Sequence, residues 1–141
     1  MKRDFSIKQK LSGFCEKIGI PSNEYPLVDD NGMYSRDGIY FSATPPYFFR
    51  VVERGITVSK TDCKCLDEMY YGIMKLLSYD IAIHREAKQR KNGEDPRRQI
   101  CSIQYELLKK LDVSFGKMYL HDIEELLRVY PFNDHIEGED K

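Results

Sequence analysis

One block of strand-forming sequence, between Ile39 and Ser59, separates stretches whose apolar residues recur at helical spacing. Segregated strands and helices are typical of an α+β fold, in which helices cover a face of an antiparallel sheet. Two turn sequences, Ala43–Pro46 and Arg54–Gly55, divide the block into short apolar runs. Because short connections join antiparallel neighbours, we predict a three-stranded antiparallel meander. Its expected strands are Ile39–Ser42, Tyr47–Glu53 and Ile56–Ser59.

Helical periodicity and capping residues predict four helices around this sheet. Aspartate or threonine before an apolar run can accept bonds from free backbone N–H groups, and proline suits the first helical position. The expected architecture is an N-terminal helix, the meander, and then three helices packed on the sheet. The expected helices are Asp4–Lys17, a long helix from a cap at Thr61 or Asp62 to about Arg90, a third helix opened by Asp95 and Pro96, and Leu120–Val129.

The length of 141 residues suits one domain, so residues 1–133 are expected to form a single α+β domain. Residues 134–141 are rich in acidic side chains and are expected to be a disordered tail. The N-terminus has no apolar run after its basic start, and no stretch reaches the ~18 apolar residues that a membrane span needs. We therefore expect a cytoplasmic protein without a membrane partner, whose four cysteines remain thiols. The oligomeric state does not follow from the sequence.

The balance of charge argues against nucleic-acid binding through an overall positive field, because the formal net charge is -1. The stretch from Arg85 to Arg98 is nevertheless the most basic in the chain. It leaves open an alternative function, a regulator that binds nucleic acid through this stretch. A simpler interpretation is that its cations cap the C-terminal end of a helix.

Side chains capable of chemistry do not form a recognisable catalytic or metal-binding pattern. Cys63 and Cys65 lack the second ligand pair that a zinc site requires. His84 follows Asp80 by one helical turn, which would suit a general base, but it falls on the predicted apolar stripe of the long helix. We therefore predict a binding protein without cofactor or metal, and keep a small hydrolase using His84 as a third possibility.

Two further features suggest a docking surface. The strands carry many aromatic residues, so one sheet face is either an exposed aromatic patch or is covered by the first helix. Arg97 and Arg98 begin a helix, where their charge opposes the helix dipole, so we expect carboxylates such as Asp95 or Glu53 to hold one or both. The aromatic residues concerned are Tyr40, Phe41, Tyr47, Phe48 and Phe49.

The chain resembles the immunity protein 63 family of bacterial polymorphic toxin systems. The resemblance lies in Glu53-Arg54-Gly55 at the end of a strand, in Thr61–Glu68, and in Asp95-Pro-Arg97-Arg98 followed by Gln99–Leu108. It implies a small protein that binds and blocks a cognate toxin domain, with no catalytic residue of its own. Since a few aromatic and arginine side chains dominate most interfaces, we expect the partner-binding anchors among Tyr47, Phe49, Arg54, Arg97 and Arg98.

Overall fold

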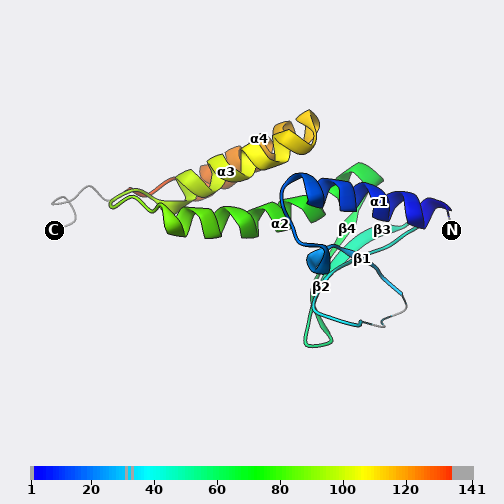
Figure 1. Ribbon diagram of the computed structural model, residues 1–141. Coiled ribbons are helices and arrows are strands. Elements are labelled where there is room, and N and C mark those ends of the chain that lie inside the picture. Colours follow the sequence, from blue (N-terminus) through cyan, green and yellow to red (C-terminus); the bar gives the residue numbers. More distant parts are fainter. Residues whose placement is uncertain (1, 31, 33, 135–141) are drawn as a thin grey trace. The chain divides into compact units, whose positions relative to one another are not determined.

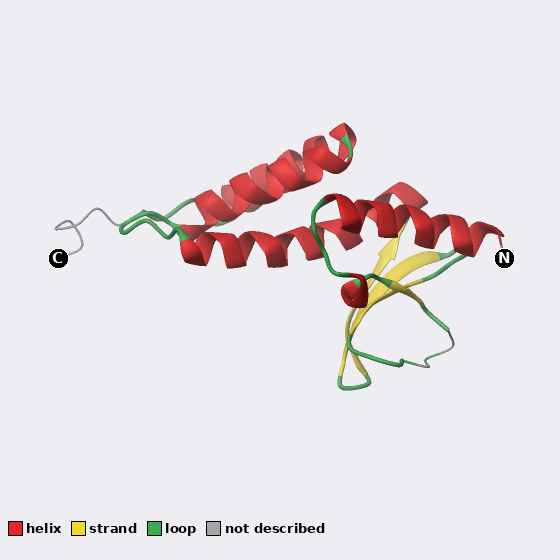
Figure 2. Cartoon of the chain, viewed as in Figure 1, coloured by secondary structure: helices red, strands yellow, loops and turns green. Residues whose placement is uncertain are grey.

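The computed structural model describes residues 2–30, 32 and 34–134. Their contacts divide the chain into two compact units, Met1–Met74 and Lys75–Lys141. All strands belong to the first unit, and the second is helical (Figure 2). No helix within the described ranges is both long enough and apolar enough to cross a membrane. The elements in order are α1 (Lys2–Lys17), η1 (Ser22–Glu24), β1 (Leu27–Val28), β2 (Gly38–Phe41), β3 (Tyr47–Glu53), β4 (Ile56–Cys63), α2 (Leu66–Lys88), α3 (Pro96–Leu111) and α4 (Val113–Val129).

The first unit holds a four-stranded sheet in the order β1-β2-β3-β4 (Figure 1). The strands β2, β3 and β4 form the predicted antiparallel meander, and the short β1 pairs with β2 in parallel. Phe41, Phe49 and Thr61 lie opposite one another across the three antiparallel strands, and Tyr40, Arg50 and Lys60 do the same one residue away. Because side chains alternate along a strand, these two rows point to opposite faces of the sheet.

The face that carries Phe41 and Phe49 is packed into the core of the first unit. Gly72 of α2 lies against the Phe49 ring so closely that a Cβ atom there would meet Phe49 Cε1 at 2.5 Å. Phe14 of α1 meets Tyr70 of α2 edge-on, with ring centroids 6.0 Å apart. The N-terminal turns of α2 therefore contact both the sheet and α1.

The second unit packs α3, α4 and the part of α2 that follows Lys75 around a core with a polar centre. The buried Gln104 donates to the carbonyl of Lys75 at 2.8 Å and accepts from the Tyr119 hydroxyl at 2.7 Å. Asp112 joins α3 to α4, and its side chain caps α4 by accepting from the backbone N–H of Ser114. Buried amides of this kind are stable only when both ends are bonded, as they are here.

Two predictions at the sheet are corrected by the structure. The strand β1 was not expected, since a two-residue strand has too little sequence for a periodic signal. Thr61 and Asp62 do not cap α2 but pair with Phe49 and Phe48 inside β4. The reason is the length of β3, whose seven residues require a partner strand that continues to Cys63.

Two predictions in the helices are also corrected. α4 begins at Val113 rather than Leu120, because Asp112 caps it and Phe115 and Tyr119 already lie on its buried face. His84 is not on the buried stripe of α2, since its side chain is 72% exposed. The buried positions in this part of α2 are the smaller or polar Ser78, Ala82 and Glu86.

Candidate partner-binding groove and the C-terminal clasp

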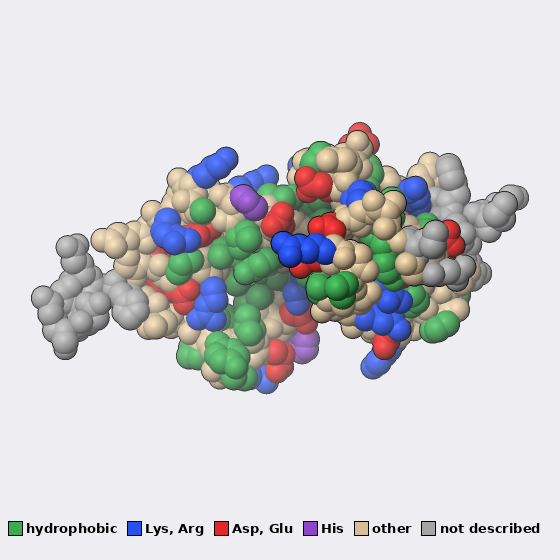
Figure 3. Space-filling view, turned by 90° about the horizontal axis from the view of Figure 1, so that it is seen from below, with side chains coloured by type: hydrophobic (Ala, Val, Ile, Leu, Met, Phe, Trp, Pro, Cys, Tyr) green, Lys and Arg blue, Asp and Glu red, His purple; other side chains and the backbone are tan. Residues whose placement is uncertain are grey.

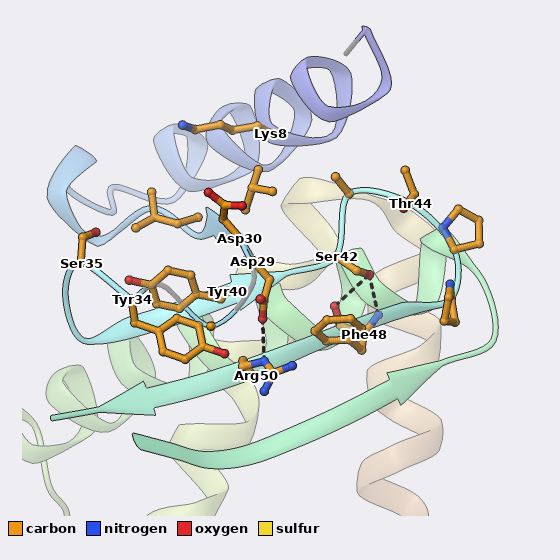
Figure 4. A pocket seen from close by; sticks show the side chains of 16 residues that line it. Lys8, Asp29, Asp30, Tyr34, Ser35, Tyr40, Ser42, Thr44, Phe48 and Arg50 are labelled. Carbon is orange, nitrogen blue, oxygen red and sulfur yellow. Dashed lines mark hydrogen bonds and ion pairs between the residues drawn. The ribbon is translucent and has the colours of Figure 1, made fainter. Parts of the chain in front are cut away.

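A groove of about 1100 Å³ opens on the first unit, on the sheet face of Tyr40 and Arg50. Its walls come from α1, from the segment between β1 and β2, and from the turn between β2 and β3 (Figure 4). The side chains that give it chemical character are those of Lys8, Asp29, Asp30, Tyr34, Ser35, Tyr40, Ser42, Thr44, Phe48 and Arg50. We call this feature the groove.

The charged centre of the groove is an ion pair between β3 and the segment that follows β1. Arg50 Nε lies 2.6 Å from Asp29 Oδ2, and neither of these two buried atoms has a hydrogen-bond partner in the described part of the chain. Their contact is therefore an ion pair without hydrogen-bond alignment. Arg50 Nη1 also donates to Thr57 Oγ1 at 3.3 Å. Figure 4 shows Asp29 pointing toward Arg50 from above the strand.

Aromatic rings lie beside this ion pair. Their burial shows how far the sheet face of Tyr40 and Arg50 is exposed. Tyr40 is covered, at 2% exposure, by the tilted Tyr34 ring with centroids 4.8 Å apart. The Tyr40 hydroxyl also donates to the carbonyl of Arg36 at 2.7 Å. Phe48 is only half-buried and lies 5.0 Å from the Arg50 guanidinium. This face is thus covered at β2 by the segment after β1 and remains open in the groove at Phe48.

Three of the predicted partner anchors belong to the first unit. Phe49 is 5% exposed, and its contact with Gly72 gives it a packing role in the core. Tyr47 opens β3 opposite Cys63 and is half-buried. Arg54 is exposed in the β3–β4 turn with a φ of 54°, and its backbone N–H donates to Asp37 Oδ1. Partner binding by Tyr47, Phe49 and Arg54 stays a prediction.

The other two predicted anchors lie in a feature that we call the clasp, formed by Asp95, Arg97, Arg98 and residues 130–134. Arg97 donates to both Asp95 oxygens and, through Nη1 and Nη2, to the carbonyls of Tyr130 and Pro131. Asp95 also caps α3 and accepts from the backbone N–H of Asn133 at 2.8 Å. The hydrogen bonds from Arg97, ahead of those from the two backbone N–H groups, hold the pKa of Asp95 well below its ordinary value.

Arg98 completes the clasp on its other side. Its Nε donates to Asp134 at 2.9 Å, and its guanidinium lies 4.3 Å from the Phe132 ring. Asp134 in turn accepts from the backbone N–H of Asp95 at 2.7 Å. Both arginines thus have carboxylate partners: Asp95 holds Arg97 as expected, whereas Arg98 is held by Asp134 rather than by Glu53. The structure gives both arginines a role in holding the C-terminal segment, and partner binding by either of them stays a prediction. Residues 135–141 of the predicted tail lie outside the described residues, and the single-domain prediction stays a prediction.

Half of the cations in the basic stretch between Arg85 and Arg98 are paired with carboxylates in the structure. Arg90 makes two hydrogen bonds to Glu86, which is 1% exposed, while Arg97 and Arg98 are occupied in the clasp. On the face drawn in Figure 3, Lys and Arg side chains lie among Asp and Glu side chains rather than in one basic surface. Arg90, Arg97 and Arg98 are therefore already paired, which weakens the alternative that this basic stretch binds nucleic-acid phosphates.

The remaining reactive side chains do not converge in the described part of the chain. His84 Nδ1 lies 2.7 Å from the carbonyl oxygen of Asp80, and neither residue lines the groove. Among the described residues, no group of three or more His, Cys, Asp or Glu side chains is arranged to hold a metal ion. Cys63 ends β4 and is half-buried, and Cys65 is exposed.

The cysteines give a direct test of burial in the first unit. Burial raises the pKa of Cys15 to about 12, and burial together with Glu68 and Asp62 raises that of Cys63 to about 11. Because the thiolate is the reactive form, we expect brief alkylation by iodoacetamide near neutral pH to modify Cys65 well before Cys15. Peptide mass spectrometry measures this order, and in urea the two should react alike. Equal rates in the folded protein would contradict the packing of α1.

Fold and groove together describe a small α+β protein whose open groove is lined by aromatic and charged side chains. The sequence profile of the family described as immunity protein 63 matches residues 44–125, and the chain belongs to this family. The match takes in β3, β4, α2, α3 and most of α4, whereas residues 130–134 of the clasp lie beyond it. Searches of curated proteins and of solved structures found no match. Membership of an immunity-protein family implies a toxin as partner.

Sequence reasoning missed the central groove residues, Asp29, Tyr34 and Arg50. A signal for one of them was present, because Arg50 is a lone cation within the strand sequence Tyr47–Glu53. A charged residue in the middle of a largely apolar strand has to find a partner or a solvent-facing site. The partner Asp29 lies 21 positions earlier, and the sequence alone does not indicate that pairing.

Proposed function

We propose that this chain binds a cognate toxin domain in the cytoplasm and neutralises it by occluding the toxin's active site. The observation that carries the proposal is the family match over residues 44–125. An inhibitor of this kind acts by binding, and it needs no catalytic group of its own. An interface that excludes water from an active site usually buries ~1,600 Å² in total.

The groove supports the proposal because its composition suits a protein partner. Tyr and Arg side chains are enriched among the residues that dominate binding, and they are most effective in a concave, partly desolvated site. Tyr34, Phe48 and Arg50 provide such a cluster, and Thr44, Pro45 and Pro46 border it. We therefore assign the toxin contact to the groove and the surface around it.

A second surface of the chain serves as an internal comparison. α4 exposes Leu120, Leu126 and Val129 at 50%, 42% and 67%. The charged residues beside them are engaged within the helix, since Arg128 pairs with Glu124 and Glu125. This surface offers apolar area without the arginine and aromatic cluster found in the groove.

The test is rescue of bacterial growth by co-expression with the toxin domain encoded by the neighbouring reading frame. We expect the wild-type chain to restore growth and to bind the inactivated toxin domain. Phe48→Ala should weaken binding at least about tenfold, as for a residue at the centre of an interface, whereas Leu120→Ala should change it less than about twofold. Absence of both rescue and binding by the wild-type chain would refute the function. If Leu120→Ala weakened toxin binding and Phe48→Ala did not, the interface would lie on α4 instead.

A further inference from the structure

Arg50 has more hydrogen-bond donors than the described part of the chain uses. A guanidinium carries five N–H groups in a rigid planar fork. Nε faces Asp29 Oδ2 and Nη1 donates once to Thr57 Oγ1, while Nη2 has no hydrogen-bond partner among the described residues. The side chain is 22% exposed and lines the groove, so Nη2 remains for an acceptor that enters from solvent.

The position of this guanidinium is set before any partner arrives. Phe48 lies 5.0 Å and Tyr34 5.9 Å from its centre, both within the range of cation–π attraction. Asp29 and Thr57 hold the fork from the side of the protein. A side chain that is already ordered loses little entropy when it binds, so its contact with a ligand contributes more to affinity.

The surrounding charges favour a small anion over a long polyanion. Lys8 lines the groove, and Lys60 lies over the Phe48 ring at 4.7 Å, with only a 3.6 Å contact to the exposed Asp62. Asp30 is exposed in the same groove. Lys8 on the groove wall and Lys60 beside Phe48 add positive charge that favours a single carboxylate at Arg50, whereas a phosphate backbone running along the groove would also face Asp30.

We propose that Arg50 is the anchor for one carboxylate side chain, an Asp or Glu of the toxin, which enters the groove and binds the donors that Asp29 and Thr57 leave free. This inference rests on the proposed function and adds to it the chemistry of the partner. The carboxylate is the natural ligand because its two oxygens match the planar fork of arginine. Lys8 and Lys60 attract it, and Tyr34 and Phe48 exclude water around the contact.

The experiment pairs substitutions on both sides of the complex. The probe is the inactivated toxin domain from the neighbouring reading frame, in which each surface Asp and Glu is changed singly to Asn or Gln. Binding to the wild-type chain should fall at least about tenfold for one carboxylate, because the Nη donors of Arg50 would lose their charged acceptor in the complex. Arg50→Lys should bind the wild-type toxin domain more weakly, and the same toxin substitution should then cause little additional loss of affinity. Arg85→Lys, on an exposed turn of α2, is the matched control. It should show the same loss of affinity for the toxin variant as the wild-type chain does.

The outcomes separate the two proposals. If the wild-type chain does not bind the toxin, the proposed function and this inference both fall. If it binds and no single carboxylate matters, or if the sensitive carboxylate does not couple to Arg50, only the inference falls. The toxin-side scan uses the unaltered chain, so a scan in which no single carboxylate matters overturns the inference even if Arg50→Lys folds poorly. Competition with the toxin by a single-stranded RNA of twelve nucleotides, lost in Arg50→Lys, would identify phosphate as the ligand and overturn the carboxylate assignment.

Discussion

The Asp95→Ala variant should unfold with a free energy about 2–4 kcal/mol below that of the wild-type chain. Asp95 is 7% exposed, and its carboxylate serves three partners at once: the N-terminus of α3, the Arg97 guanidinium and the backbone N–H of Asn133. Alanine removes all three contacts and leaves Arg97 without its charged partner. Urea denaturation followed by circular dichroism measures the loss.

A matched control and a pH series test whether the loss comes from the helix cap and ion pair of Asp95. Asp112 also caps a helix but is exposed, so Asp112→Ala should cost about 1 kcal/mol. The pKa of Asp95 is lowered in the folded protein, so its stabilisation is complete above the ordinary value of 3.8 and is lost as the pH falls through the folded-state value. The difference in unfolding free energy between wild type and Asp95→Asn should therefore narrow as the pH falls below about 3.8. An equal difference in unfolding free energy at pH 7 and at about pH 3 would contradict the ion pair with Arg97.

The second large effect is expected at Gly72, where alanine should destabilise the first unit by about 1–3 kcal/mol although it favours helices. A Cβ atom on Gly72 would lie 2.5 Å from Phe49 Cε1 and 2.7 Å from Phe49 Cζ. The Phe49 ring is 5% exposed, so it has to displace core neighbours in order to move away. Thermal and urea unfolding of Gly72→Ala provide the measurement.

Gly13 offers a control of the opposite sign on another helix. A Cβ atom there meets nothing within 4 Å, so Gly13→Ala should stabilise the protein by up to about 1 kcal/mol through helix propensity alone. Adding Phe49→Leu should recover part of the stability that Gly72→Ala loses, because the smaller side chain vacates the space of the ring tip. If Gly72→Ala stabilises the chain as Gly13→Ala does, the close packing of α2 on β3 is wrong.

The local parts of the fold were predictable because their signals are local. The strand Tyr47–Glu53 and the turn at Gly55 are where alternation and turn chemistry put them. The cap at Asp95 with Pro96 behind it starts α3 as predicted. The expectation that a carboxylate would hold Arg97 is confirmed at Asp95, whose cap position places it two residues away.

Predictions failed where a distant part of the chain decided the outcome. Thr61 has good capping chemistry, yet β3 recruits it into β4 because backbone pairing over seven residues outweighs one cap. The large apolar residues of α2 predict one buried stripe along the helix. Met69, Tyr70 and Ile73 are buried as this stripe requires. In the second unit, helix packing buries Ser78 and Ala82 instead, and His84 is exposed. Small side chains let helices approach closely, and a count of apolar residues does not record that preference.

The amino-acid sequence by itself determined the α+β class, the antiparallel meander, the start of α3 and the family to which the chain belongs. Only the tertiary structure decided that Arg98 holds Asp134, 36 positions away, and that Arg50 meets Asp29 in a groove with Tyr34 and Phe48. The physical reason is the distance along the chain over which each kind of interaction acts. Caps, turns and periodicity act over a few residues of chain, whereas ion pairs and grooves depend on which distant segments the packed core brings together.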